Sequence, residues 1–215
     1  MKSQGARLLP AALLLACLLG GCATQDIKLT DPERDPWEGY NRQIHAFNMS
    51  FDRAVFRPVA KGYDAVMPDG PQRGVRNFFR NLGYPVTLLN SLLQGNMERA
   101  FTSTGRFMMN TTIGLLGFFD VATKAGIPVY EEDFGQTLAT WGWMDSRYLV
   151  MPVLGPFTVR DLLGRSFYGY AHPVSWAIRE HDQYLPLIVD LISLRAELLP
   201  LQAELYAAAD PYGLI

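Results

Sequence analysis

An apolar segment that ends in a cysteine determines which part of this chain is left to fold. Lys2 and Arg7 make the N-terminus positive, residues 8–19 are apolar apart from Pro10, and Gly20-Gly21-Cys22 follows. This order is typical of a secretory signal with a lipoprotein cleavage site, after which Cys22 is acylated and becomes the first residue. An ordinary signal peptide with Cys22 as a bystander is the less favoured alternative. A spanning helix is excluded, because the apolar run is shorter than the ~20 residues that a bilayer needs.

We therefore expect three parts: a lipoprotein signal peptide over residues 1–21, a flexible polar tether over residues 22–34, and one helical domain over residues 35–215. Several acyl chains on Cys22 would anchor the protein stably, whereas one chain holds only marginally. Ala23 stands where many lipoproteins retained in the inner membrane have an aspartate. This favours a lipid-anchored protein on the periplasmic side of an outer membrane.

Composition excludes several classes of function. The chain has two cysteines, and once Cys17 leaves and Cys22 is acylated no thiol remains for a disulfide, a metal or nucleophilic catalysis. Without Lys2 and Arg7, 17 basic residues face 21 acidic ones, so we expect no nucleic-acid partner. Hydrophobic residues make up 49% of the chain and charged residues only 19%, which indicates that some apolar surface faces lipid.

Apolar residues recur at helical spacing along most of the domain, which predicts an all-α fold. The first helix is expected to start with Asp35 as its N-cap in a capping-box-like sequence, and to bend or end at Arg57-Pro58. A turn at residues 67–71 precedes a helix that we expect to end at Gly83, and Pro85 is expected to start the next one.

The second half of the domain gives weaker signals. Asn96 is expected to cap a helix, residues 134–143 look weakly helical, and residues 148–152 could be a short extended piece. Thr158 with Asp161 predicts a capped helix through about Gly169, and residues 186–199 form a clear helical pattern that Pro200 interrupts. Strand patterns are nearly absent.

No catalytic motif or metal-ligand spacing is recognisable, and we expect neither a metal nor a cofactor. The acidic run Glu131–Asp133 could bind a cation or a partner, although a solvated loop is favoured. Arg73, Arg76 and Arg80 share one helix face, which suits phospholipid headgroups or a partner, with a charged outer face as an equal alternative. The apolar run Ile113–Phe119, with Phe118 and Phe119 as candidate membrane-facing residues, favours a core position slightly over membrane contact.

Specific motifs add a family resemblance. The stretch from Asp35 to Arg42 (Asp-Pro-Trp-Glu-Gly-Tyr-Asn-Arg) resembles the start of the MlaA (VacJ) family of outer-membrane lipoproteins. Further matching motifs follow in order over most of residues 35–212: Ala46-Phe47-Asn48, Arg57-Pro58-Val59-Ala60, Asn77-Phe78, Leu93-Gln94-Gly95, Arg106-Phe107, Gly114 to Ala122, Phe134 to Leu138, Thr158 to Asp161 and Asp210-Pro211-Tyr212.

The resemblance implies a ring-like bundle of amphipathic helices that lies in the inner leaflet of the outer membrane around an amphipathic channel. It further implies a protein that is no enzyme, associates with a trimeric porin, removes mislocalised phospholipids from the outer leaflet and passes them to an MlaC-like periplasmic carrier. Such a protein maintains outer-membrane lipid asymmetry. The alternatives are a structural lipoprotein that braces a porin and, less favoured, an envelope phospholipase that uses Ser175 near His172 or His181.

Four polar residues are candidates for the channel lining that contacts headgroups: Asn41, Arg42, Asn48 and Arg106. Amide groups and guanidiniums suit phosphodiester oxygens. Capping or hydrogen bonding between helices is an equally favoured role for each of them.

Overall fold

The structure, a computed structural model, describes residues 35–173, 184–207 and 210–214. The expected signal peptide, tether and Cys22 lie outside the described residues. The elements are α2 (Glu38–Phe51), the π-helix η2 (Asp52–Phe56), α3 (Arg57–Val66), α4 (Asp69–Leu93), α5 (Met97–Thr112), α6 (Val121–Lys124), α7 (Phe134–Thr140), β1 (Tyr148–Met151), β2 (Gly155–Thr158), α8 (Val159–Ala171), α10 (Tyr184–Glu197), α11 (Gln202–Ala207) and the 3₁₀ turn η3 (Pro211–Leu214).

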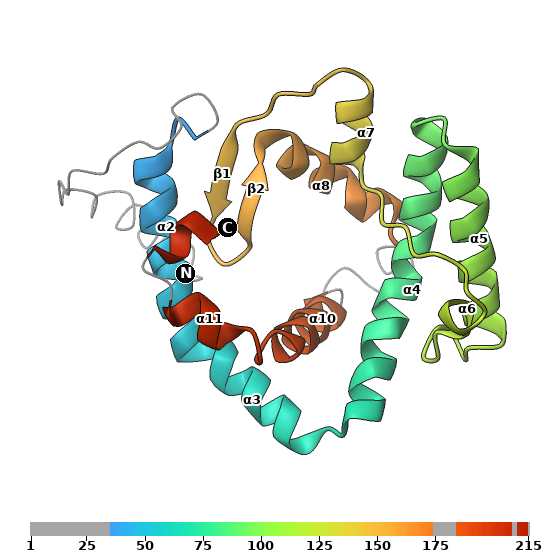
Figure 1. Ribbon diagram of the computed structural model, residues 1–215, viewed down its shortest axis with the longest axis horizontal. Coiled ribbons are helices and arrows are strands. Elements are labelled where there is room, and N and C mark those ends of the chain that lie inside the picture. Colours follow the sequence, from blue (N-terminus) through green and yellow to red (C-terminus); the bar gives the residue numbers. More distant parts are fainter. Residues whose placement is uncertain (1–34, 174–183, 208–209, 215) are drawn as a thin grey trace, which may run out of the picture.

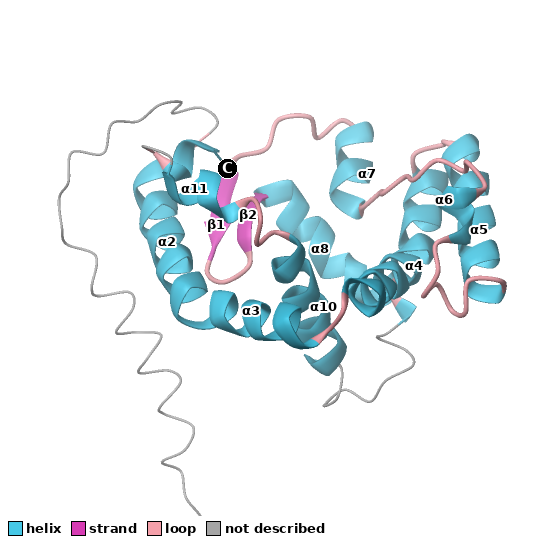
Figure 2. Ribbon diagram, turned by 60° about the horizontal axis from the view of Figure 1, so that its bottom comes forward, coloured by secondary structure: helices cyan, strands magenta, loops and turns pink. Residues whose placement is uncertain are grey.

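The helices follow one another around a ring (Figure 1). α2 and α3 form one side, α4 forms the opposite side, and α7 and α8 close the arc between them, while α10 lies along the inside of the ring. α5 packs on the side of α4 that faces away from α10 (Figures 1 and 2). The one sheet among the described residues is the antiparallel hairpin β1–β2, with Tyr148 opposite Thr158. The predicted helical, ring-like fold is confirmed.

The first helical stretch begins differently from the prediction and does not end at Pro58. Asp35 does not cap α2, because its carboxylate accepts hydrogen bonds from Asn41 and Tyr212 instead. Pro58 does not end the stretch: a π-helical turn, in which the Arg57 amide donates to the Asp52 carbonyl, precedes it and leads directly into α3. A π turn widens the helix locally, so the missing proline N–H is accommodated without a break.

The two helices predicted on either side of Gly83 and Pro85 are one helix, α4, of 25 residues. The prediction of a C-cap at Gly83 is therefore wrong. The helix is fixed by its packing against α5, where small side chains such as Ser91 and Ser103 are fully buried and permit close approach. Tertiary packing thus outweighs the local preference of glycine and proline.

Other predicted ends are confirmed. The Asn96 side chain accepts a hydrogen bond from the Arg99 amide and caps α5. Thr158 and Asp161 exchange hydrogen bonds between side chain and backbone at 3.2 and 3.4 Å, as a capping box does. The extended piece at residues 148–151 is β1, whereas its partner strand β2 gave no signal in the sequence.

The described interior is polar, and much of the apolar surface is outside. Fully buried side chains include Glu38, Asn41, Thr137 and Arg106, while the buried apolar set is mostly small. Large apolar side chains are exposed instead, and those on α5 and the loop after it are Met97, Phe101, Met108, Ile113, Leu115, Leu116 and Phe119. This distribution is unlike that of a water-soluble domain and indicates a surface that contacts apolar material.

The loop after α5 overturns the favoured core position for residues 113–119. Leu115 and Leu116 are 66% and 63% exposed and adopt φ angles of 51° and 58°. This left-handed conformation costs a non-glycine residue about 1–2 kcal/mol. Asn81 on α4 offsets part of that cost by donating to the Leu116 carbonyl, and Asn77 donates to the carbonyl of Phe118. The loop is therefore held in a strained form that presents apolar side chains.

Asp52 joins three segments and gives the fold a predicted acid sensitivity. Its carboxylate accepts hydrogen bonds from Arg195 on α10 at 2.7 and 2.9 Å and from the Tyr206 hydroxyl on α11 at 2.7 Å. Burial raises the pKa of Asp52, but the hydrogen bonds and charge of Arg195 and the bond from Tyr206 outweigh it, and the pKa lies below the usual 3.8. The stabilisation is complete above the unfolded-state pKa and is lost as pH falls through the lower folded-state pKa.

Asp52→Asn should therefore lower the free energy of unfolding at pH 7 by about 2 kcal/mol, as expected for hydrogen bonds to a charged group. Below about pH 4 the Asp52 carboxylate begins to be protonated in the unfolded wild-type chain. The difference in free energy of unfolding between wild type and variant should therefore shrink below that pH. Urea unfolding followed by circular dichroism between pH 7 and pH 3 measures this. A difference that stays constant over the whole range would contradict it.

Candidate functional site

Two of the sequence-predicted lining residues, Asn41 and Asn48, lie two helical turns apart on α2 and hold the β-hairpin. Asn41 donates to the Tyr148 carbonyl at 3.2 Å and accepts from the Val150 amide at 2.8 Å. Asn48 donates to the Met151 carbonyl at 3.0 Å and accepts from the Val153 amide at 2.7 Å. Val153 has a φ of 68°, which is strained for a β-branched residue, so Asn48 stabilises the hairpin turn.

Arg42 connects α2 with the C-terminal turn η3. Its guanidinium donates to Glu38 at 2.7 Å and, as a fork, to both carboxylate oxygens of Asp210 at 2.9 and 3.0 Å. It also lies 4.4 Å from the centre of the Tyr212 ring. The hydrogen bond and charge of Arg42 hold the pKa of Asp210 below its usual value. Segments 168 residues apart are joined here.

Arg106, like Asn41, has no exposed surface. Its guanidinium donates to Asp120 at 2.8 and 2.9 Å, to the Tyr84 hydroxyl at 2.6 Å, to the Thr123 hydroxyl at 2.8 Å and to the Ile127 carbonyl. Asn41, Arg42 and Asn48 lie together on α2, whereas Arg106 lies on α5. All four make the contacts of the alternative role, hydrogen bonding between elements, and a lining role stays a prediction.

The predicted basic face of α4 is divided between different contacts. Arg73 is exposed, Arg76 forms an ion pair with Glu197 of α10 at 3.0 Å, and Arg80 lies 3.8 Å from Glu131. Phe119 is 48% exposed. Phe118 is half-buried, and its ring lies where a side chain on Gly74 would otherwise stand. A membrane-facing or partner role for these five residues stays a prediction.

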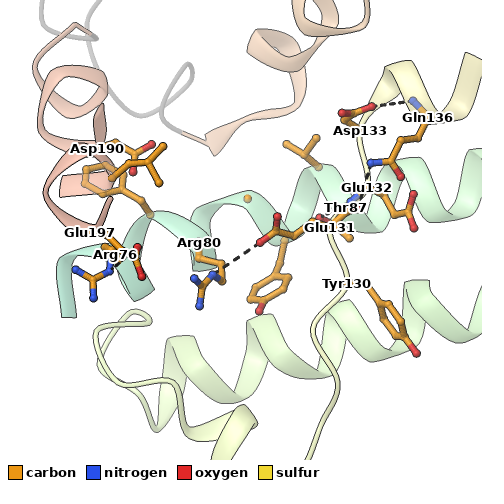
Figure 3. Close-up of a pocket in the computed structure, with 15 residues that line it drawn as sticks. Arg76, Arg80, Thr87, Tyr130, Glu131, Glu132, Asp133, Gln136, Asp190 and Glu197 are labelled. Atoms are coloured by element: carbon orange, nitrogen blue, oxygen red, sulfur yellow. Dashed lines mark hydrogen bonds and ion pairs between the residues drawn. The ribbon is translucent and has the colours of Figure 1, made fainter. Parts of the chain in front are cut away.

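A charged cavity of about 440 Å³ lies between α4, α10 and the loop before α7 (Figure 3). Its lining comprises Arg76, Phe79, Arg80, Gly83, Tyr84, Val86, Thr87, Tyr130, Glu131, Glu132, Asp133, Gln136, Asp190, Leu194 and Glu197. Burial raises the pKa of Asp190, and the charge of Arg165 only partly opposes this. The acidic run is not a simple solvated loop, because Glu132 is buried and paired with Arg99.

A second, apolar cavity of about 390 Å³ lies on the other flank of α10. It is lined by α2, η2, the β-hairpin and α10, mainly through Met49, Phe51, Phe56, Val150, Val153, Leu191, Leu194 and Leu198. Leu194 lines both cavities. A polar space and an apolar space thus lie on the two flanks of one helix inside the ring.

Sequence reasoning identified Arg76, Arg80, the acidic run Glu131–Asp133 and Asn48, but missed the other residues that line these cavities. Arg76, Arg80, Gly83 and Thr87 share one face of α4, but the expected break at Gly83 concealed the alignment. The contribution of α10 could not be anticipated, because Asp190, Leu194 and Glu197 meet α4 only in the closed ring. In the sequence, the only indication of a shared role was that these three residues are four and three positions apart, which places them on one face of a helix.

Within the described residues no helix is both long and apolar enough to cross a membrane, and no group of three or more His, Cys, Asp or Glu side chains could hold a metal ion. Of the residues considered for a phospholipase, Ser175 and His181 lie outside the described residues.

Comparison with known proteins places these features in a family. The model for the family described as MlaA lipoprotein matches residues 33–215. The chain belongs to the MlaA lipoprotein family. The resemblance inferred from the sequence motifs is therefore confirmed.

Several relatives support the assignment. Proteins named intermembrane phospholipid transport system lipoprotein MlaA are 33% identical in Escherichia coli K12, over 96% of this chain and 83% of that protein, and 32% identical in Haemophilus influenzae, over 94% and 82%. An uncharacterised protein of Rickettsia prowazekii is 36% identical over 83% of this chain and 72% of its own length.

A solved MlaA-family structure shares the fold. It was described under the heading "Structural basis for maintenance of bacterial outer membrane lipid asymmetry", and it superposes with a TM-score of 0.74 at 32% identity. The match covers 84% of this chain and 92% of that one.

Proposed function

We propose that this chain is the outer-membrane lipoprotein of an intermembrane phospholipid transport system. It removes phospholipids that have reached the outer leaflet and passes them to a soluble periplasmic carrier, which maintains lipid asymmetry. It acts as a conduit and not as an enzyme. The signal peptide of residues 1–21 is removed, Cys22 carries the acyl anchor, and residues 22–34 tether the domain on the periplasmic side.

The observation that carries this proposal is the pair of cavities on the two flanks of α10, both of which Leu194 lines. A phospholipid needs charged partners for its headgroup and apolar shelter for its acyl chains, and the two cavities offer these on either flank of α10. Their volumes, about 440 and 390 Å³, lie within the range of about 300–1,000 Å³ that small-molecule sites have. The names of the curated relatives agree with such a substrate.

The outer surface supports a position in the inner leaflet of the outer membrane. Helix α5 and the loop 113–119, which carry exposed apolar side chains, lie on the outside of the ring, away from α10 (Figure 1). Amphipathic elements bind in a leaflet by burying such surface among acyl chains. A trimeric porin and an MlaC-like carrier complete the proposed pathway, and these two partners are supported by the family resemblance alone.

The loop 113–119 should account for much of the leaflet binding. Burial of one leucine side chain is worth about 1.5–3 kcal/mol, so Leu115→Asp with Leu116→Asp should weaken vesicle binding of the anchor-free Cys22→Ala chain at least 100-fold. Co-sedimentation with phospholipid vesicles measures the partition coefficient. Val66→Asp, at an exposed position on α3, is the control for an added charge. Equal loss in both variants would argue against a specific role for the loop.

The transport function is tested by outer-leaflet phospholipid in cells that lack the protein, with wild type or Cys22→Ala added back. We expect phospholipid to accumulate outside in the deletion and only the acylated form to correct it. Unchanged asymmetry in the deletion would contradict the proposal. If porin also copurified with the protein in that case, the porin-bracing alternative would replace it.

A further inference from the structure

The charged cavity holds more negative than positive charge. Five carboxylates line it, and only two guanidiniums, those of Arg76 and Arg80, accompany them. Glu132 is neutralised from outside the cavity, because Arg99 donates to its carboxylate. The other four acidic residues are Glu131, Asp133, Asp190 and Glu197. A purely anionic ligand would therefore meet a net repulsive field.

The two guanidiniums are nevertheless placed to bind an anionic group. Arg76 and Arg80 lie one helical turn apart on the face of α4 that lines the cavity (Figure 3). Each pairs with a carboxylate through Nε, to Glu197 at 3.0 Å and to Glu131 at the long distance of 3.8 Å. No hydrogen bond within the described part of the chain occupies their terminal nitrogens. The planar fork of such a group matches two phosphate oxygens.

Asp190, on the facing helix α10, provides a negatively charged group that can bind a cation. Its carboxylate lines the cavity, is partly buried, and makes no hydrogen bond or ion pair with another described residue. A partly buried carboxylate that accepts no hydrogen bond from a described residue is stabilised by an arriving cation that donates hydrogen bonds. Glu131 and Glu197 border the same space, and each of these two carboxylates would be released if its arginine bound phosphate.

Acceptors for a cation and donors for a phosphate therefore occur in one cavity. We propose that the charged cavity selects phospholipids whose headgroup carries a primary ammonium. The phosphodiester binds Arg76 and Arg80, and the ammonium binds Asp190 together with a carboxylate released from its arginine. The apolar cavity on the other flank of α10, which Leu194 also lines, takes an acyl chain. This selectivity rests on the proposed transport of phospholipids, and it adds which headgroup the same site prefers.

The experiment measures binding of three lipids with identical acyl chains to the purified full chain in detergent, by native mass spectrometry. The lipids are phosphatidylethanolamine, phosphatidylglycerol, and N-acetylated phosphatidylethanolamine, which keeps the phosphodiester but lacks the positive charge. We expect phosphatidylethanolamine to bind about tenfold more tightly than the other two, because one ammonium–carboxylate pair of this kind is worth about one factor of ten.

Variants connect the preference to the cavity. Asp190→Asn with Glu131→Gln should reduce the preference to less than twofold, with circular dichroism confirming the fold. Glu98→Gln, an exposed acid on α5 outside the cavity, should leave it at tenfold. Equal binding of all three lipids by wild type, or an unchanged preference in the double variant, would overturn the headgroup selectivity and leave phospholipid transport standing. Absence of binding to any of the three would overturn both.

Discussion

Gly83→Leu should abolish phospholipid removal while leaving the protein folded. Gly83 lines the charged cavity from α4, and a Cβ added there would meet no other atom within 4 Å. A leucine side chain therefore extends into the cavity and occupies the space that a headgroup needs. Because leucine replaces glycine inside a helix, the free energy of unfolding should stay the same or rise by about 0.5–1 kcal/mol. Outer-leaflet phospholipid should reach the level of the deletion strain.

Gly62→Leu is the matched control for this prediction. Gly62 is exposed on α3, also has no atom within 4 Å of an added Cβ, and lines neither cavity. The Gly62→Leu variant has the same gain in helix propensity, and it should restore lipid asymmetry as wild type does. Full restoration by Gly83→Leu, at wild-type abundance, would show that phospholipids do not pass through the charged cavity.

The position of Gly83 also shows where prediction from the sequence ended. Local signals located most helices and the caps at Asn96 and Thr158, because capping depends on side chains within three residues. They failed at Gly83-Pro85 and at Pro58, where contacts with distant elements or a π turn keep the helix continuous. Such effects depend on neighbours that a single stretch of sequence does not show.

The sequence predicted which types of side chain the candidate site contains, but not all of the residues that form it. Polar and arginine side chains were expected around a lipid path, and Arg76 and Arg80 were identified as one face. The residues that face them, Asp190 and Glu197, lie more than a hundred positions away on α10, and the closure of the ring brings them close. Arg106 was identified as a lining candidate because a guanidinium suits phosphodiester oxygens. Its burial against Asp120 could not be read from spacing alone.

Arg106→Leu should destabilise the protein by about 3–5 kcal/mol, the usual cost of removing one partner of a buried ion pair. Asp120 would lose its cation, and the Ile127 carbonyl and Tyr84 hydroxyl would lose their donor. Burial raises the pKa of Asp120, and hydrogen bonds from Thr123 and Asn110 with the charge of Arg106 hold it below 3.8. In the variant the carboxylate keeps the hydrogen bonds from Thr123 and Asn110 but has lost its cation. Urea unfolding at pH 7 measures the loss.

The same variant distinguishes a structural Arg106 from one that contacts lipid. Arg73→Leu, an exposed arginine on α4, should change the free energy of unfolding by less than about 0.5 kcal/mol, as surface substitutions do. Arg106→Lys keeps the charge, but its single nitrogen cannot contact Asp120, the Tyr84 hydroxyl and the Ile127 carbonyl together, so it should still lose about half as much as leucine does. If Arg106→Leu kept wild-type stability and lost only transport, the guanidinium would act on the phospholipid. If stability, abundance and transport fall together, the role of Arg106 is structural: its contact with Asp120 holds α5 to the segment that follows it.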